Sequence, residues 1–355
     1  MAKNLKQYGW EYIVVDIQWS NPTAPNHEYQ PFTELCMDEY SRLIPAEERF
    51  PSAKEGKGFA QLAEYVHSLG LKFGIHIIRG IPRQAVHRNT RIKGTDITAR
   101  QIAKTDSICH WNTDMYGVDP TKDGAQEYYD SIFELYREWG VDFVKVDDIA
   151  RELPHEEAEL VMLSDALHGC GRDMLLILSP GPALIEKAEL YKQTANMWRI
   201  TDDFWDKWEL LYAMFERAEK WCIHTGAGHW PDADMLPIGP ILQDYDKSIR
   251  TKFTEDEPVT MVTLWSIFRS RPSRPVYRRN ADGNEYILWT AFSSEGGYYA
   301  AVFNAGDNDG VMNVDIEAAE IYGKVSGKEL WSGESVSAEN SFEVKLPKHG
   351  AKAFY

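Results

Sequence analysis

Residues 124–148, GAQEYYDSIFELYREWGVDFVKVDD, decide the fold. The first part of this stretch has apolar residues at helical spacing, and Gly140 is a typical residue to end a helix. Residues 141–146, VDFVKV, follow at once and predict a strand from their valine and phenylalanine residues, after which come Asp147 and Asp148. A helix, a buried strand and polar residues at the strand's carboxyl end form the repeating unit of a parallel α/β sheet.

The same alternation recurs in both directions along the chain. We expect further strands at residues 12–16, 71–78, 174–178 and 197–200, and further helices at 59–69, 156–168, 184–191, 204–221 and 259–269. Buried strands that alternate with helices indicate a parallel sheet, either open or closed into a (β/α) barrel.

The pattern changes after residues 270–275, SRPSRP, which are typical of a linker. Short strands with Gly, Asn and Asp turns follow at 286–290, 298–303, 310–314 and 342–355, and no long helix is evident. This predicts a C-terminal antiparallel β-sandwich. We therefore expect two domains, a (β/α) barrel at residues 1–272 and a sandwich at 273–355.

Charge and composition exclude several classes of protein. The 355 residues carry 38 Lys and Arg against 55 Asp and Glu, which gives a formal net charge of −17. Phosphate-rich surfaces need clustered cations, so neither nucleic acid nor a membrane is expected as a partner. No apolar run reaches ~18 residues, which argues against a transmembrane helix. The four cysteines include no CxxC pair, so free thiols are expected rather than a disulfide framework or a zinc site.

The first residues, MAKNLKQ, lack the apolar stretch of a signal peptide, so the sequence as written predicts a cytoplasmic protein. A secreted or periplasmic protein is the alternative if the N-terminus is truncated. The 12 Trp and 18 Tyr are typical of a large core, and alternatively of a surface that stacks on sugar rings. The sequence predicts no particular oligomeric state.

Acidic residues recur where the predicted strands end: Asp16, Asp147, Asp148, Asp202, Asp203, Asp232 and Asp234. In a (β/α) barrel these ends form the mouth of the active site. Because like charges at one rim repel each other, a chain that keeps them is expected to use them for chemistry. A single one, such as Asp148 or Asp202, is equally well explained as a helix N-cap.

Two carboxylates across a polar cleft support glycoside hydrolysis, metal binding or general acid/base catalysis. Glycoside hydrolysis needs one ionised and one protonated carboxyl group, ~5–5.5 Å apart for retention or ~6.5–9.5 Å for inversion. Lys145 lies on the same strand face as Asp147 and favours its ionised form, as a nucleophile requires, although a simple structural ion pair is the alternative. Neither HxH nor HExxH is present, and a lone His76 inside a strand is more typical of a hydrogen-bonded residue than of a ligand. We therefore expect no metal.

Five segments, in this order, resemble glycoside hydrolase family 27, the α-galactosidase and α-N-acetylgalactosaminidase family of clan D. WEYIVVDIQW at 10–19 resembles the family's GYEYINIDDCW, and LKFGIH at 71–76 resembles LKFGIY. GVDFVKVDD at 140–148 resembles WGVDYLKYDN, RITDDFWD at 199–206 resembles RTTGDIED, and GHWPDADML at 228–236 resembles GHWNDPDML. The resemblance implies a (β/α)8 TIM-type barrel followed by a C-terminal antiparallel β-sandwich.

The resemblance also implies a retaining exo-α-glycosidase that needs no cofactor. Its substrate would be an oligosaccharide or glycoconjugate with a terminal α-galactosyl group, or alternatively a terminal α-N-acetylgalactosaminyl group. Asp147 matches the family's nucleophile and Asp203 its acid/base, and we expect the two to converge on one sugar-sized pocket. The substrate-binding positions that it implies are Asp16, Trp19, His76, Lys145, Ser179, Ala183, Arg199 and Asp234.

Two positions and one loop depart from the family pattern. Ile17 stands where the family has a second aspartate and cannot hydrogen-bond a sugar hydroxyl, which weakens the expected contact with the galactose 4- and 6-positions. His76 replaces the usual tyrosine. In the loop LSPGPA, Ser179 and Ala183 resemble the Ser and Ala of the N-acetylgalactosaminidase type, with a spacing one residue longer.

Two barrel strands of the family have no counterpart in this sequence. The sequence begins just before the segment that resembles the family's second barrel strand. After residues 265–270 it continues directly into the β-rich tail, without a segment that resembles the family's eighth strand and helix. Strands one and eight are neighbours in a closed barrel, so this predicts six strands with open edges at the gap. The hypothesis is a family member of reduced or absent activity. An inactive carbohydrate-binding protein is the alternative of another class, and a metal-dependent barrel hydrolase is a third.

Overall fold

The computed structural model describes residues 1–25, 29–30, 32–151, 156–244, 247–270 and 272–355. The chain forms two compact units, Met1–Trp198 and Arg199–Tyr355. All four cysteines are free thiols. Among the described helices, none has the length and apolar character needed to cross a membrane.

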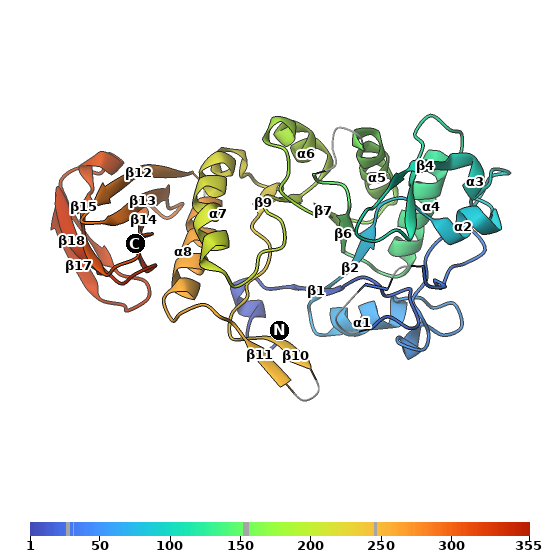
Figure 1. Cartoon of the computed structure of the whole chain (residues 1–355), viewed down its shortest axis with the longest axis horizontal. Helices are drawn as coiled ribbons and strands as arrows, with labels where there is room; N and C mark the ends of the chain where they lie inside the picture. Colours follow the sequence, from blue (N-terminus) through green and yellow to red (C-terminus); the bar gives the residue numbers. More distant parts are fainter. Residues whose placement is uncertain (26–28, 31, 152–155, 245–246, 271) are drawn as a thin grey trace. The chain divides into compact units, whose positions relative to one another are not determined.

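The first unit is built on a parallel sheet with the strand order β1-β2-β6-β7-β8 (Figure 1). The strands are β1 (Tyr12–Val15), β2 (Lys72–Ile78), β6 (Phe143–Asp147), β7 (Leu175–Leu178) and β8 (Met197–Arg199), and the helices between them are α1 (Ala60–Ser68), α4 (Ala125–Glu138), α5 (Glu157–Gly169) and α6 (Ala188–Thr194). Short 3-10 turns lie at η1 (Lys6–Tyr8), η2 (Pro51–Ala53) and η3 (Ile185–Lys187). Strand β2 is buried at every position after Lys72, as expected for a sheet covered on both faces.

The stretch that predicts the fold forms the elements expected of it. Helix α4 buries Tyr128, Ile132 and Tyr136 at helical spacing on one face and packs against α5. Gly124 and Gly140, just outside the helix, have φ values of 90° and 76°, which favour glycine. The chain then enters β6.

A small antiparallel sheet in the order β3-β5-β4 lies between β2 and α4 in the sequence and was not predicted. Its strands are β3 (Ile81–Pro82), β4 (Ala103–Ile108) and β5 (Met115–Val118), accompanied by α2 (Arg83–Arg88) and α3 (Ala99–Ile102). Gly80 links β2 to this sheet with φ +93°, and a Cβ atom there would lie 1.9 Å from the carbonyl oxygen of Tyr116. Only glycine allows this close approach of two backbones.

The second unit begins at the end of β8. Ile200 donates its N–H to the carbonyl of Asp232, 2.9 Å away, and so joins this strand end to β9 (Trp230–Asp232). The helices are α7 (Trp208–Trp221) and α8 (Glu257–Arg269), with the turn η4 (Cys222–His224) and the hairpin of β10 (Pro240–Asp244) and β11 (Lys247–Arg250). Helix α7 starts at Trp208, later than the predicted position 204, and the N–H of Phe204 is bound by the side chain of Asp234.

The tail of the second unit is a sandwich of two four-stranded antiparallel sheets, in the orders β12-β13-β14-β19 and β15-β18-β17-β16. The strands are β12 (Ser273–Ala281), β13 (Asn284–Phe292), β14 (Tyr298–Asn304), β15 (Gly310–Asp315), β16 (Lys324–Lys328), β17 (Ser335–Glu339), β18 (Ser341–Leu346) and β19 (Ala351–Phe354), with the turn η5 (Glu317–Ala319). Leu288, Val302, Val314 and Leu346 lie in its core. The predicted linker at 270–275 is wrong from Ser273 onward, since Ser273 already pairs with Ala291.

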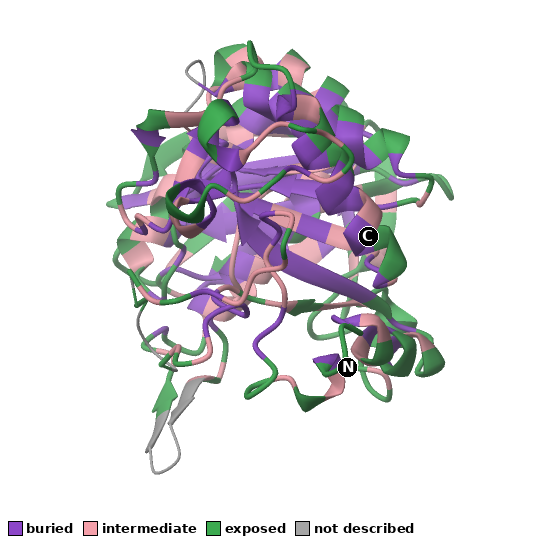
Figure 2. Cartoon of the chain, turned by 90° about the vertical axis from the view of Figure 1, so that its right-hand side faces the viewer, coloured by how far each residue is buried: buried purple, intermediate pink, exposed green. Residues whose placement is uncertain are grey.

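The predicted fold class is therefore confirmed: parallel strands of a TIM-type barrel are followed by an antiparallel sandwich. The described residues contain six barrel strands, β1, β2, β6, β7, β8 and β9, and the core of the parallel sheet is buried in Figure 2. The domain boundary at 272–273 falls between α8 and β12 and stays a prediction. Helix α8 packs against β13, β14 and β19, so the second compact unit includes it together with the sandwich.

Candidate active site

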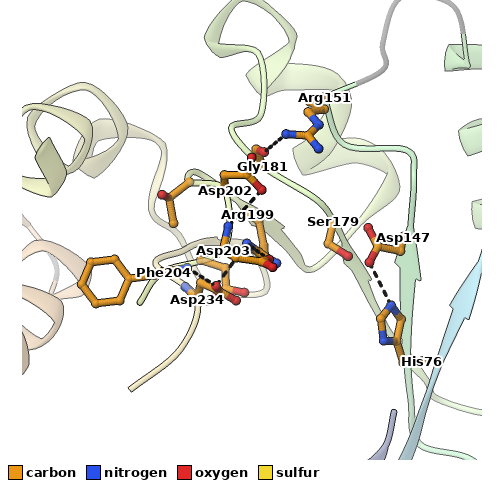
Figure 3. Close-up of polar contacts among 12 residues, drawn as sticks. His76, Asp147, Arg151, Ser179, Gly181, Arg199, Asp202, Asp203, Phe204 and Asp234 are labelled. Carbon is orange, nitrogen blue, oxygen red and sulfur yellow. Dashed lines mark hydrogen bonds and ion pairs between the residues drawn. The ribbon is translucent and has the colours of Figure 1, made fainter. Parts of the chain in front are cut away.

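Four of the predicted site residues lie at neighbouring positions in the parallel sheet of the first unit. Asp16 follows β1, His76 lies on β2, and Lys145 and Asp147 lie on β6. His76 pairs in register with Lys145, and side chains two residues apart on a strand share a face. Figure 3 shows the imidazole of His76 and the carboxylate of Asp147 pointing toward each other.

His76 bridges two carboxylates. Its Nε2 lies 3.1 Å from Oδ2 of Asp147, and its Nδ1 forms a hydrogen bond with Oδ1 of Asp16. An ionised carboxylate only accepts hydrogen bonds, so the arrangement fits a cationic ring in which both nitrogens donate. The ring is 2% exposed, which places this charge inside the wall of the site. The prediction of a hydrogen-bonded residue rather than a metal ligand agrees with these contacts.

The environment of Asp147 favours its ionised form. Burial acts to raise the pKa of this carboxyl group, but the hydrogen bond and charge of His76 and then the charge of Lys145 outweigh it. The backbone N–H of Asp148, 2.9 Å from Oδ1, adds to the effect, and the pKa lies below its ordinary value of 3.8. The sequence predicted only Lys145 as the stabilising cation; His76 contributes more.

Asp148 points away from Asp147 into a buried ionic cluster. Its carboxylate lies 2.9 Å from the guanidinium of Arg79, whose Nε also donates to the Asp148 carbonyl at 2.6 Å. The same guanidinium pairs with Glu159 at 3.0 Å and with Glu156 at 3.4 Å. Asp148 is therefore not a helix N-cap. It fixes the chain immediately after Asp147, and the ionic cluster of Arg79, Asp148, Glu156 and Glu159 is buried throughout.

Sequence reasoning missed Arg79, although a signal was present. An arginine that ends an otherwise apolar strand, in HIIRG, needs buried carboxylates to compensate its charge. In the cluster, burial raises the pKa of Glu159 to about 7 against the opposing effect of Arg79 and of a hydrogen bond from Tyr129.

Three predicted substrate contacts are buried in the first unit. Trp19 is 2% exposed, packs against Phe59, and donates its indole N–H to the carbonyl of His76 at 2.8 Å. Ser179 has no exposed surface, and its backbone N–H bonds the Val146 carbonyl at 2.9 Å. Ala183 is also buried. Trp19 therefore supports the strand that carries His76, and the roles of Trp19, Ser179 and Ala183 as substrate contacts stay predictions.

An apolar wall stands beside Asp16. Ile17 and Trp111 pack against a small cluster of Ile78, Cys109 and Met115. The Asp16 side chain itself is 74% exposed and thus open to a ligand. Trp111 was not predicted as a site residue, because nothing in its local sequence shows that it lies near Ile17.

In the second unit, Arg199 holds two of the predicted acidic residues. Its guanidinium, 3% exposed, lies 3.1 Å from Oδ1 of Asp203 and 3.1 Å from Oδ2 of Asp234, as Figure 3 shows. Asp234 also accepts the N–H of Phe204 at 2.8 Å, whereas the Asp203 side chain is 63% exposed. The Nε of Arg199 is buried and has no hydrogen-bond partner among the residues that the structure describes.

The two remaining acidic positions of this unit shape turns. Asp202 accepts the backbone N–H of Asp203 at 3.0 Å, and Asp232 accepts that of Asp234 at 3.1 Å. Asp202 is not the N-cap of α7, a position that Lys207 occupies. Within the described part of the chain, no group of three His, Cys, Asp or Glu side chains is arranged to hold a metal ion.

The predicted catalytic carboxyl groups belong to different compact units, Asp147 to the first and Asp203 to the second. Their convergence on one pocket stays a prediction. Asp147 is buried and held ionised, whereas Asp203 is exposed and paired with Arg199, and their catalytic roles stay predictions.

Comparison with known proteins gives consistent matches along the chain. A family model described as Alpha galactosidase A matches residues 120–271, and one described as Alpha galactosidase C-terminal beta sandwich domain matches residues 283–355. Alpha-galactosidase 3 of Arabidopsis thaliana is 28% identical over 239 residues, which are 67% of this chain and 42% of that protein. Alpha-N-acetylgalactosaminidase of Rattus norvegicus is 27% identical over 307 residues, 79% of this chain and 57% of that protein. The chain thus spans about half the length of these relatives.

A solved structure is much more similar. The GH27 β-L-arabinopyranosidase of Geobacillus stearothermophilus is 48% identical, with a TM-score of 0.94, and the match covers 100% of this chain and 89% of that one. An aspartate-to-alanine variant of the same protein, solved in complex with arabinose, gives the same identity and TM-score.

Proposed function

Because the chain belongs to glycoside hydrolase family 27, we propose that it is a retaining exo-glycosidase that removes terminal β-L-arabinopyranosyl groups from oligosaccharides or glycoconjugates. The observation that carries the choice of sugar is Ile17, an apolar side chain where the family has a second aspartate. The similarity of the whole chain to an arabinopyranosidase supports the same choice.

The two sugars differ in one group. β-L-Arabinopyranose and α-D-galactopyranose have the same configuration at their ring hydroxyls, but arabinopyranose lacks the exocyclic CH2OH. A site that offers a carboxylate to this hydroxyl gains from binding galactose, whereas an apolar side chain leaves the hydroxyl desolvated and unpaired. Ile17 and the wall of Ile78 and Trp111 therefore favour the sugar without the CH2OH group.

The proposed reaction has two steps. Asp147 attacks the anomeric carbon while Asp203 donates its proton to the leaving oxygen, so the glycosidic C–O bond breaks and a glycosyl ester forms on Asp147. Asp203 then removes a proton from water, the water attacks the anomeric carbon, and the ester bond breaks with net retention. This mechanism requires that both carboxyl groups reach the same glycosidic bond.

The surroundings of Asp147 support its role as the nucleophile, and neighbouring side chains are suited to bind the sugar. The lowered pKa of Asp147 keeps the nucleophile ionised at neutral pH. The exposed carboxylate of Asp16 and the ammonium of Lys145 are suited to bind sugar hydroxyls, and the buried Nε of Arg199 is a donor without a partner among the described residues. Asp203 is exposed enough to exchange protons with water and leaving group.

The predicted α-galactosidase activity is the second candidate. The names of the matching family model and of the Arabidopsis relative favour it, and Asp16 retains one of the two carboxylates of the family pattern. The N-acetylgalactosaminidase alternative has less support. Ser179, which would leave room for an acetamido group, has no exposed surface.

The test is a panel of nitrophenyl glycosides: β-L-arabinopyranoside, α-galactoside and α-N-acetylgalactosaminide. We expect the highest kcat/KM for the arabinopyranoside, a loss of turnover in Asp147→Asn, and a shift toward the galactoside in Ile17→Asp. A higher kcat/KM for the galactoside rejects the choice of sugar. Calorimetric binding of arabinose by a folded chain that hydrolyses no member of the panel rejects the enzyme and establishes the carbohydrate-binding alternative.

A further inference from the structure

A separate polar pocket of about 530 Å3 lies in the first unit, near the start of α2. The lining residues that bear on its chemistry are Phe32, Arg83, His87, Arg100, Asp114 and Tyr116. Two arginines around one carboxylate give the pocket a positive formal charge, in a chain whose formal net charge is −17. Such a reversal of sign is typical of a site for an anionic ligand.

No carboxylate among the described residues forms an ion pair with Arg83, although its charge acts on the carboxyl group of Asp114. Its Nη1 donates to the carbonyl of Thr113 at 3.1 Å, and its guanidinium lies over the rings of Tyr116 and Phe32, 4.9 and 5.5 Å from their centres. Arg100 donates one N–H to the carbonyl of His87 at 3.0 Å. Neither arginine forms an ion pair with any residue that the structure describes, so each keeps donors for a ligand.

The carboxylate of Asp114, the acidic side chain among the lining residues, already accepts hydrogen bonds from other parts of the chain. Asp114 is buried, its Oδ1 accepts the backbone N–H of Phe32 at 2.8 Å, and its Oδ2 accepts the side-chain amide of Gln18 at 3.1 Å. It therefore shapes the pocket and leaves the guanidinium groups to a ligand. The Phe32 ring is 74% exposed and presents an apolar face, as stacking on a sugar ring requires.

The pocket adjoins the residues proposed to bind the terminal sugar. Gln18, which fixes Asp114, comes directly after Ile17 in the chain. A smaller hollow of about 30 Å3 is lined by Ile17, His76 and Asp114 together, so it connects the wall of the pocket with the proposed sugar site.

We propose that this pocket binds the sugar on the leaving-group side of the substrate and selects a uronic acid there. Arg83 and Arg100 bind the carboxylate, a role for which the planar guanidinium is suited, and Phe32 stacks on the ring. The inference rests on the proposed glycosidase function of the neighbouring site. It adds the chemical class of the second sugar, which neither the family match nor the names of the relatives provide.

Binding is tested first, without turnover, by calorimetric titration of the full chain with D-glucuronate, D-glucose and inorganic phosphate at equal ionic strength. We expect glucuronate to bind, and binding to weaken at least about tenfold in Arg83→Gln and in Arg100→Gln, as expected for loss of a charged hydrogen bond. Arg88→Gln is the matched control, because Arg88 lies on the same helix but pairs with Glu34 outside the pocket. Absence of glucuronate binding overturns the proposal, and so does equal binding of phosphate, which would show an unspecific anion site.

Turnover is tested second, with β-L-arabinopyranosyl groups linked either to glucuronic acid or to glucose. We expect a kcat/KM ratio of at least about ten in favour of the acidic substrate, and a fall of this ratio in Arg83→Gln that results from a higher KM. If the enzyme is active and this kcat/KM ratio is near one, the proposed preference for a uronic acid is rejected, whereas the proposed glycosidase function stands. If no glycoside is hydrolysed at all, the proposed function fails, and the titration alone decides whether the pocket binds uronate.

Discussion

Replacement of His76 by phenylalanine tests how the nucleophile is kept ionised. The change retains a flat ring of similar shape at a position that is 2% exposed, but it removes both nitrogens. Asp147 then loses the donor 3.1 Å from its Oδ2, and Asp16 loses its partner as well. Lys145 and the backbone N–H of Asp148 remain as the stabilising groups of the Asp147 carboxylate.

The magnitude follows from the contact that is lost. A hydrogen bond to a charged group contributes about 1.5–3 kcal/mol, and 1.36 kcal/mol corresponds to one pH unit in a pKa. Burial, the largest influence on Asp147, raises its pKa, and in the variant the main opposing influence is gone. We therefore expect the pKa of Asp147 to rise by about 1–2 pH units.

The assay is the pH dependence of kcat/KM on nitrophenyl β-L-arabinopyranoside. The nucleophile must be ionised, and its pKa in the native chain lies below 3.8, so this group limits activity only below that pH. In His76→Phe the acid limb should move to higher pH, while the alkaline limb, set by the acid/base, stays in place. His168→Phe is the control, because His168 is exposed on α5. An unchanged acid limb in a folded variant would refute the proposed role of His76.

Two further predictions concern the buried ionic cluster. Arg79→Met leaves Asp148, Glu156 and Glu159 buried without their cation. We expect it to lower the free energy of unfolding, measured by urea titration, by about 3–5 kcal/mol. A loss below about 1 kcal/mol contradicts the inferred stabilising role of Arg79. For Glu159, the folded pKa of about 7 lies above the ordinary 4.5, so its contribution to stability is present below pH 4.5 and is lost as the pH rises through 7. This loss of stability is on the order of 3 kcal/mol between pH 5 and 8, and Glu159→Gln should remove it. If the variant loses as much stability over the same pH range, Glu159 is not the group that titrates.

Much of the first unit could be predicted because its signals are local. Strand β6 is rich in valine and phenylalanine, α4 has a helical apolar face between two glycines, and both patterns are visible within a few neighbouring residues. The acidic residues at strand ends were recognisable for the same reason: in a parallel sheet, position along the strand already tells which end a residue occupies.

The partners of these residues could not be predicted, because they are far away in the sequence. The bond between His76 and Asp147 joins residues 71 positions apart, and that between Arg79 and Glu159 joins residues 80 apart. The antiparallel sheet β3-β5-β4 was missed because β3 and β5 are short and β4 is mostly polar. Burial of Trp19 depends on Phe59 and Trp139, which no local pattern connects with it.

Strand β2, more than β6 itself, determines how the nucleophile is presented. It supplies His76, which pairs with the Asp147 carboxylate, and leads to Arg79, which pairs with Asp148; the backbone N–H of Arg79 also bonds the Asp147 carbonyl at 3.1 Å. Trp19 in turn bonds the carbonyl of His76. The side chain of Ile17 takes no part in these hydrogen bonds and packs on the apolar wall beside Asp16, whereas its backbone N–H bonds Oδ1 of Asp16 at 3.0 Å, a bond that a change of side chain retains. A change at position 17 can therefore alter the preferred sugar without disturbing the nucleophile, which is why Ile17→Asp is the variant that separates specificity from catalysis.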